Sequence, residues 1–189
     1  MRNILRRKIL RLGILPLVAT LALVVALAGT AYANNVHLKG GPHAQPAFTD
    51  NGLTLTAAGT LAGLGFGDVL VNLSATANPT AVCTNNGSNA APGQNPAPVT
   101  VTGSVAIPAG AIKNGNAPFS VSTNPPPSPI AGAPDCANPN WTETITDMAF
   151  TSATLTVDQP TLVLTVACTF SAPTANGAVP AGNVNCTSS

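Results

Sequence analysis

The chain has 189 residues, of which 7% are charged, and its formal net charge is +1 at pH 7. Five of the seven Lys and Arg residues lie within residues 2–11, so the remainder carries 2 − 6 = −4 charges and lacks the basic face that nucleic-acid binding requires. The length fits one domain, and the abundant Val, Ile and Thr residues in alternating runs exclude a disordered chain.

The first 33 residues have the three parts of a cleavable signal peptide. A basic stretch is followed by an apolar run over residues 14–27 and then by the small-residue cleavage site Ala31-Tyr32-Ala33. The apolar run is shorter than the about 20 residues that span a bilayer, so a retained membrane anchor is the less favoured alternative. We therefore expect a secreted, extracellular protein, exported by either the general secretory or the twin-arginine route.

Residues 34–45 are predicted to form a flexible N-terminal arm, and residues 46–189 a single domain. Within the domain, apolar side chains alternate with Thr, Ser and Asn at period two, which is typical of half-buried strands. The alternating runs cover residues 53–57, 69–75, 99–107, 119–121, 153–157 and 162–170. This pattern predicts an all-β fold: an antiparallel β-sandwich of about seven or eight strands, immunoglobulin-like in the broad sense.

The connections between these runs are of two kinds. Asn51-Gly52, Asn114-Gly115 and Asn176-Gly177 each separate two strand-like runs, and Asn-Gly is a preferred pair for tight hairpin turns. Residues 84–98 and 124–140 are rich in Pro, Asn and Gly and are expected to form long loops.

The four cysteines, Cys83, Cys136, Cys168 and Cys186, all follow the signal peptide, and an even count in an exported chain predicts two disulfides. Cys168 and Cys186 lie at similar distances before and after Asn176-Gly177. If a hairpin forms there, the two cysteines face each other, which favours Cys168–Cys186 together with Cys83–Cys136. The other two possible pairings stay open.

Glu143 and Asp147 are the one close pair of carboxylates. They lie on a predicted strand, and four residues along a strand span about 13 Å, beyond the roughly 5–9.5 Å between the carboxylates of a glycosidase. The two acids would share a face, and we interpret them as solvated or sheet-edge charges. We therefore expect no catalytic residue in this chain.

His37 and His43 both lie in the predicted arm, and neither is near a cysteine in sequence. No metal site and no cofactor are expected. One alternative concerns copper: if the signal peptide were cleaved one residue after Ala33, His37 would be the third residue. The free amine, two amide nitrogens and the imidazole of His37 would then offer Cu(II) a square plane.

Two short stretches carry a resemblance beyond composition: residues 68–73 (DVLVNL) and 95–101 (NPAPVTV). Together with the signal peptide, they make the chain similar to small, uncharacterised secreted proteins of high-GC Gram-positive-type bacteria. The resemblance implies a bacterial secreted protein and no particular activity.

These observations predict a secreted, non-catalytic extracellular or loosely cell-wall-associated protein that acts by binding or by structure. Its partner would be an extracellular protein or a cell-wall component, and neither nucleic acid nor, after signal cleavage, a membrane is expected. Two alternatives remain. The domain would carry a small apolar ligand in a cleft of the sandwich, or it would be a small extracellular hydrolase with an unrecognised site.

Overall fold

The computed structural model describes residues 35–189 except 42, 94–96, 129–135, 137 and 161. These residues belong to one compact unit, Ala33–Ser189. The predicted signal peptide and its cleavage site lie outside the described residues. Among the residues described, no helix is long and apolar enough to cross a membrane.

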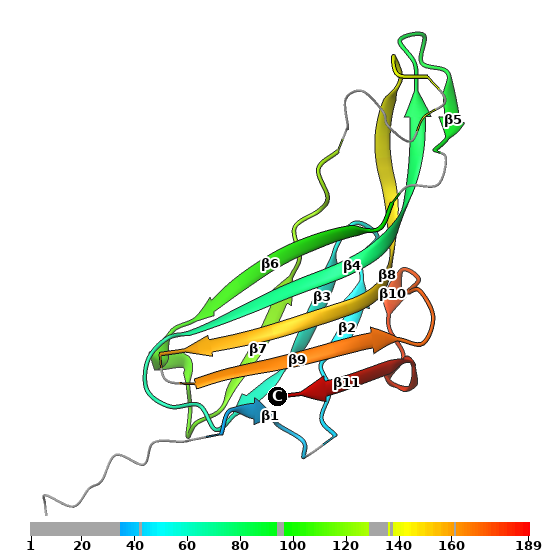
Figure 1. The fold of residues 1–189 in the computed structure, drawn as a ribbon. Helices are drawn as coiled ribbons and strands as arrows, with labels where there is room; N and C mark the ends of the chain where they lie inside the picture. The colour runs from blue at the N-terminus through cyan, green and yellow to red at the C-terminus, as the bar shows by residue number, and fades with distance from the viewer. Residues whose placement is uncertain (1–34, 42, 94–96, 129–135, 137, 161) are drawn as a thin grey trace, which may run out of the picture. The chain divides into compact units, whose positions relative to one another are not determined.

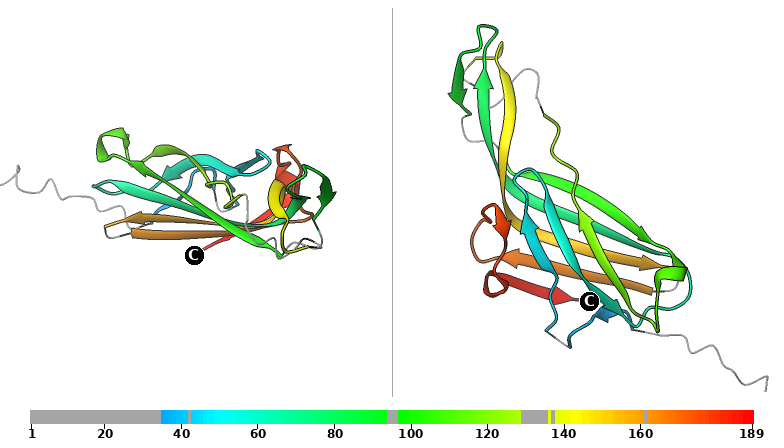
Figure 2. Two further views of the ribbon diagram at one scale, coloured as in Figure 1. Left: turned by 90° about the horizontal axis from the view of Figure 1, so that it is seen from above. Right: turned by 180° about the vertical axis from the view of Figure 1, so that it is seen from behind.

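The described chain is all-β and forms two packed antiparallel sheets (Figure 1, Figure 2). Its strands are β1 (His37–Leu38), β2 (Ala47–Asp50), β3 (Leu55–Ala62), β4 (Val69–Thr84), β5 (Ala90–Pro92), β6 (Val99–Ile107), β7 (Ala117–Ser122), β8 (Thr142–Gln159), β9 (Leu162–Phe170), β10 (Gly177–Ala178) and β11 (Val184–Ser188). Short 3-10 turns occupy Ala109–Ala111 and Ala181–Asn183. The described residues form eleven strands, eight of which have four residues or more, where the alternating runs predicted seven or eight strands.

Each sheet has a simple order. In the first, sheet A, β7, β3, β2 and β10 are neighbours in that order, and β1 pairs with the end of β3. In the second, sheet B, the order is β6, β4, β8, β9 and β11, and β5 pairs with the far end of β4. Sheet B faces the viewer in Figure 1, whereas sheet A lies behind it and faces the viewer in the right-hand part of Figure 2.

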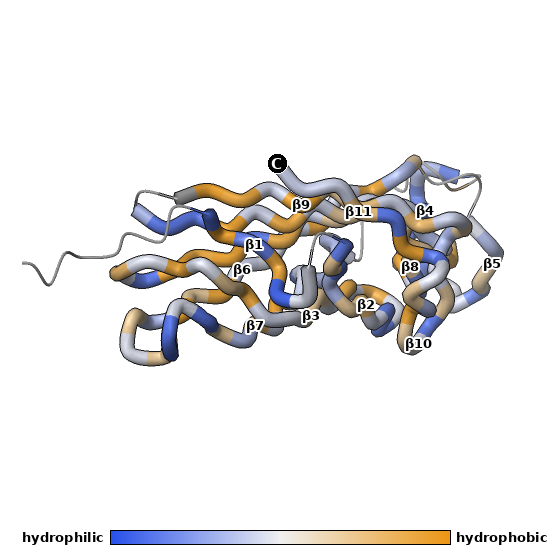
Figure 3. The backbone as a smooth tube through the Cα atoms, turned by 90° about the horizontal axis from the view of Figure 1, so that it is seen from below, coloured by the Kyte–Doolittle hydropathy of each residue, from blue (hydrophilic) through white to orange (hydrophobic). Residues whose placement is uncertain are grey.

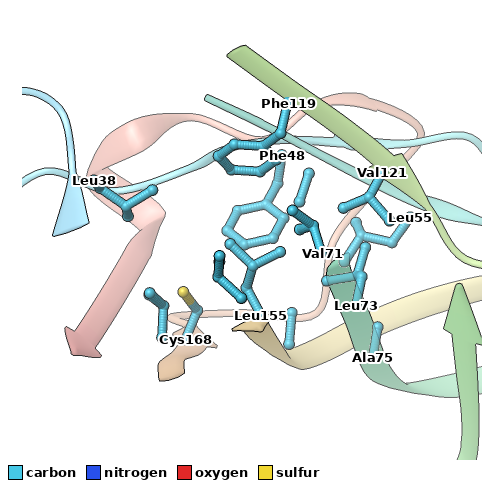
Figure 4. Packing of buried hydrophobic residues seen from close by; sticks show 14 of the residues in the cluster. Leu38, Phe48, Leu55, Val71, Leu73, Ala75, Phe119, Val121, Leu155 and Cys168 are labelled. Atoms are coloured by element: carbon cyan, nitrogen blue, oxygen red, sulfur yellow. The ribbon is translucent and has the colours of Figure 1, made fainter. Parts of the chain in front are cut away.

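The core lies between the two sheets, and the period-two alternation explains how it forms. Inward side chains of β4, such as Val71 and Leu73, are at most 1% exposed, while the residues between them remain accessible. This alternation along the strands can be followed in Figure 3. Figure 4 shows Phe48 and Phe119 of sheet A facing Val71, Leu73 and Leu155 of sheet B. Burial of these side chains is the main force that holds the sheets together.

Strands β4 and β8 are much longer than their neighbours, and their far ends leave the sandwich as a two-stranded arm with β5 alongside (Figure 1). We call this part, residues 79–84, 90–92 and 142–148, the β4–β8 arm. Two β-bulges interrupt the pairing of β8 with β4. At each bulge the extra residue is a threonine, Thr146 or Thr151, whose hydroxyl donates a hydrogen bond of 3.2 Å to a β4 carbonyl.

Asn176-Gly177 does not form the predicted tight hairpin turn. β9 and β11 do pair in the expected register, with Cys186 opposite Cys168. The chain between them, however, crosses to sheet A, where Gly177 and Ala178 of β10 pair with Asp50 and Thr49. The prediction placed the cysteines correctly because the register depends on β9 and β11, whereas the turn was wrong because a second sheet offers this segment a partner.

Part of the predicted N-terminal arm belongs to the sandwich. Val36 and Leu38 are 6% and 7% exposed and join the hydrophobic core, and β1 pairs with β3. The carbonyl of Asn35 lies so close to Gly63 that a Cβ there would sit 2.1 Å from its oxygen, which only glycine at φ +73° accommodates. The segment is therefore anchored from Asn35 to Lys39 by burial and backbone pairing.

Candidate functional site

Glu143 and Asp147, both predicted to be surface charges, differ in their burial. Glu143 is 1% exposed and lies opposite Cys83 in the β4–β8 arm, so its assignment as a solvated or edge charge is wrong. The bulge at Thr146 reverses the alternation of β8, so Glu143 and Asp147 lie on opposite faces rather than sharing one. The structure therefore does not bring them together as an acid–base pair, and Asp135 lies outside the described residues.

The two histidines are exposed, and the structure does not join them into a site. His37 lies on β1, and its Nδ1 is 2.8 Å from the carbonyl oxygen of Asn35. Within the described chain, no group of three His, Cys, Asp or Glu side chains is arranged to hold a metal ion. With cleavage after Asn34, the copper hypothesis places the free amine on Asn35, and it stays a prediction because the cleavage site includes a residue outside the described ones.

Both predicted disulfides are formed. Cys168–Cys186 joins β9 to β11 with its Cα atoms 4.1 Å apart, inside the sandwich. Cys83–Cys136 ties the β4–β8 arm to the loop that precedes β8, with its Cα atoms 5.8 Å apart. Both pairs are those favoured by the register argument, and together they indicate an oxidising, extracellular type of environment.

A polar hollow of about 330 Å³ opens on the outer face of sheet B. Its floor is formed by β6, β4 and β8, and one side is closed by Asn124, which follows β7 and donates hydrogen bonds of 2.8 and 3.0 Å to the carbonyl of Thr102. Asn72 donates one amide hydrogen to Asp158 at 3.1 Å, so its side chain is held in a fixed orientation. The polar side chains that line the hollow are Asn72, Ser74, Thr102, Ser104, Asn124, Thr154 and Thr156.

This hollow is one part of a larger regular surface. Backbone register aligns outward-facing residues of five adjacent strands into three rows, one residue per strand. In the order β6, β4, β8, β9 and β11, the rows are Thr100, Thr76, Ser152, Thr169 and Asn185; Thr102, Ser74, Thr154, Ala167 and Thr187; and Ser104, Asn72, Thr156, Thr165 and Ser189. Every position except Ala167 is Thr, Ser or Asn, and none is buried. We call this surface the hydroxyl array.

The array ends abruptly at its next row. There the outward positions are Ala106, Leu70, Asp158 and Val163, so apolar side chains and one carboxylate replace the hydroxyls. The outer face of sheet A is also different, because Ala47, Ala58 and Pro118 interrupt its Thr and Ser residues. A field of uncharged polar groups that only Ala167 interrupts is thus a property of one region of sheet B.

Sequence reasoning identified the outward residues of these strands as polar but did not identify a surface. The visible signal was the repeated alternation of Thr, Ser or Asn with an apolar residue, as in Thr100, Thr102 and Ser104. Such residues on a solvated strand face are expected in any secreted sandwich. Only the order β6, β4, β8, β9, β11 and its register align them across the sheet.

The comparisons with known proteins give no relative from which a function can be transferred. No protein-family model, no curated protein and no solved structure matches this chain.

Proposed function

We propose that this chain is exported as an immunoglobulin-like sandwich in the broad sense, and that it acts outside the cell as a non-catalytic binding protein. Its ligand would be uncharged and rich in hydroxyl groups, as a neutral saccharide is. The observation that carries the proposal is the polar hollow on sheet B, where hydroxyl and amide groups from four separate segments converge.

Export is supported by two independent features. The N-terminal 33 residues have the basic, apolar and small-residue parts of a signal peptide. The two disulfides would be reduced in most cytoplasms and persist in oxidising compartments. We also propose a bacterial origin, and this part of the proposal is supported by the resemblance of the chain to small secreted bacterial proteins.

The chemistry of the lining supports the ligand class. Hydroxyl and amide groups both donate and accept hydrogen bonds, which matches the alternating donors and acceptors of a sugar. The hollow has no cation among its lining residues, so phosphate, sulfate and carboxylate ligands would lack a counter-charge there. Recognition would depend on hydrogen bonds, since aromatic side chains do not line the hollow.

The test is electrophoresis of the purified exported protein in native gels that contain β-glucan, galactomannan or dextran. At least one of these neutral polysaccharides should retard the protein. Replacing both Thr102 and Thr154 by Val removes two exposed hydroxyls while keeping the shape of the side chains, and should weaken binding about tenfold.

The matched control is Thr60→Val on the outer face of sheet A, which should bind like the unmodified protein. Unretarded migration in all three gels would overturn the proposal. Equal weakening by Thr60→Val and by the double variant would also contradict it, because binding would then not depend on the hollow.

A further inference from the structure

The hollow occupies one end of the hydroxyl array, at β6, β4 and β8. The same types of side chain continue beyond it over β9 and β11, where Thr156 is followed by Thr165 and then by Ser189 in one row. Adjacent strands lie about 4.8 Å apart, so five strands extend about 19 Å. Three rows on one face cover about 13 Å along the strands.

A surface of this kind binds a small ligand poorly. An exposed hydroxyl bonds to water or, like those of Thr76 and Thr100, to a neighbouring hydroxyl, and exchanging that bond for one to a ligand contributes only about 0.5–1.5 kcal/mol. One sugar ring can engage few of these groups and must still lose its translational and rotational freedom. A ligand whose own groups repeat along a chain loses that freedom once and then gains many weak contacts.

The charge distribution restricts the ligand further. The three rows contain no ionisable side chain, and the nearest one, Asp158, marks the row where the array ends. Downstream of the signal peptide the chain carries more acidic than basic residues, so an anionic polymer would meet net repulsion. For an uncharged polymer, no such repulsion opposes binding to this surface.

We propose that the hydroxyl array binds an extended, uncharged polysaccharide that crosses the strands from β6 to β11, with the hollow as one of its contact points. This inference rests on the proposed function and deepens it: the ligand is a chain of several sugar residues and not a mono- or disaccharide. Affinity should therefore rise with the length of the oligosaccharide.

Ala167 offers a selective test, because it lies in the middle row on β9, outside the hollow, and contributes no hydroxyl. Ala167→Arg would place a long side chain across the path of a bound polymer while leaving the lining of the hollow unchanged. Ala47→Arg, at an exposed position of β2 in sheet A, is the matched control.

The measurement is calorimetric titration with di-, tetra- and hexasaccharides of the neutral polymer that retards the protein most. We expect the hexasaccharide to bind at least about tenfold more tightly than the disaccharide. Ala167→Arg should reduce hexasaccharide affinity to the disaccharide level and leave disaccharide affinity unchanged, and Ala47→Arg should change neither.

Four outcomes would overturn the inference in distinguishable ways. Equal affinity for all lengths would confine binding to the hollow and leave the proposed function standing. No effect of Ala167→Arg would exclude a path of the polymer across β9 and would also leave the proposed function standing. Failure to bind any length would overturn the proposed function as well. Inhibition of ice growth that is lost in Ala167→Arg, without saccharide binding, would identify an ordered ice surface as the occupant.

Discussion

Asp50 and Thr174 connect the two sheets through a small set of partly buried hydrogen bonds. Asp50, on β2 of sheet A, is 3% exposed and accepts hydrogen bonds from the amide of Gly52 and from the Thr174 hydroxyl. The same hydroxyl accepts a bond of 2.9 Å from the amide of Phe150, on β8 of sheet B. A buried carboxylate is tolerated here because its oxygens have donors.

Thr174→Val should therefore be strongly destabilising, although valine has nearly the same shape. The substitution removes one donor to Asp50 and the acceptor for Phe150, and we expect a loss of about 2–4 kcal/mol in the free energy of unfolding. Urea unfolding followed by circular dichroism measures this loss. Thr80→Val, at an exposed position of β4, is the control and should stay within about 0.5 kcal/mol. Similar urea midpoints for Thr174→Val and Thr80→Val would show that the hydrogen bonds between the sheets contribute little to the stability of the protein.

At the scale of elements, β8 shows where local pattern and tertiary pairing differ. Its buried positions follow a period of two within three segments, residues 143–145, 148–150 and 153–159, and one additional residue separates each segment from the next. The two bulges shift the alternation twice, and each shift is stabilised by a threonine hydroxyl bonded to β4. A sequence offers no signal for such a shift, because threonine is common on any strand.

Strands β6 and β7 approach each other closely at Gly103, and their contact leaves no room for a larger residue at this position. A Cβ at Gly103 would lie 1.9 Å from the carbonyl oxygen of Ser122, a backbone atom that cannot rotate away. Gly103→Ala should therefore push the strands apart and destabilise the protein by about 3 kcal/mol.

Gly110→Ala is the matched control, because nothing lies within 4 Å of a Cβ at that position. It should be neutral or slightly stabilising, by up to about 1 kcal/mol. Thermal melting of both variants checks the prediction. If Gly103→Ala were as stable as Gly110→Ala, the two strands could move apart without loss of stability, and the prediction would be wrong.

At the scale of the whole molecule, the disulfides close loops of different length. Cys83–Cys136 spans 53 residues of sequence, including β6 and β7, whereas Cys168–Cys186 spans 18. If cross-links act mainly by restricting the unfolded chain, the longer loop contributes more, about 4 kcal/mol against about 3 kcal/mol.

Replacing both cysteines of a pair by alanine measures each contribution separately. We expect both double variants to unfold at lower denaturant concentration, with the larger loss for Cys83 and Cys136. Reduction of the unmodified protein should lower its melting temperature markedly. The opposite order of the two variants would show that local packing, such as the β9–β11 pairing around Cys168, outweighs the restriction of the unfolded chain.

The sequence by itself determined the all-β class and the inward stripes of strands such as β4 and β9, and it favoured the Cys168–Cys186 pairing without excluding the others. The class and the stripes follow from the period-two alternation of polar and apolar residues, which is a local pattern and can be recognised in the sequence. The tertiary structure decided the burial of Glu143, the path of Asn176-Gly177 to sheet A and the alignment of the hydroxyl array. Each of these depends on which distant strands become neighbours and in what register, and alternation alone leaves that choice open.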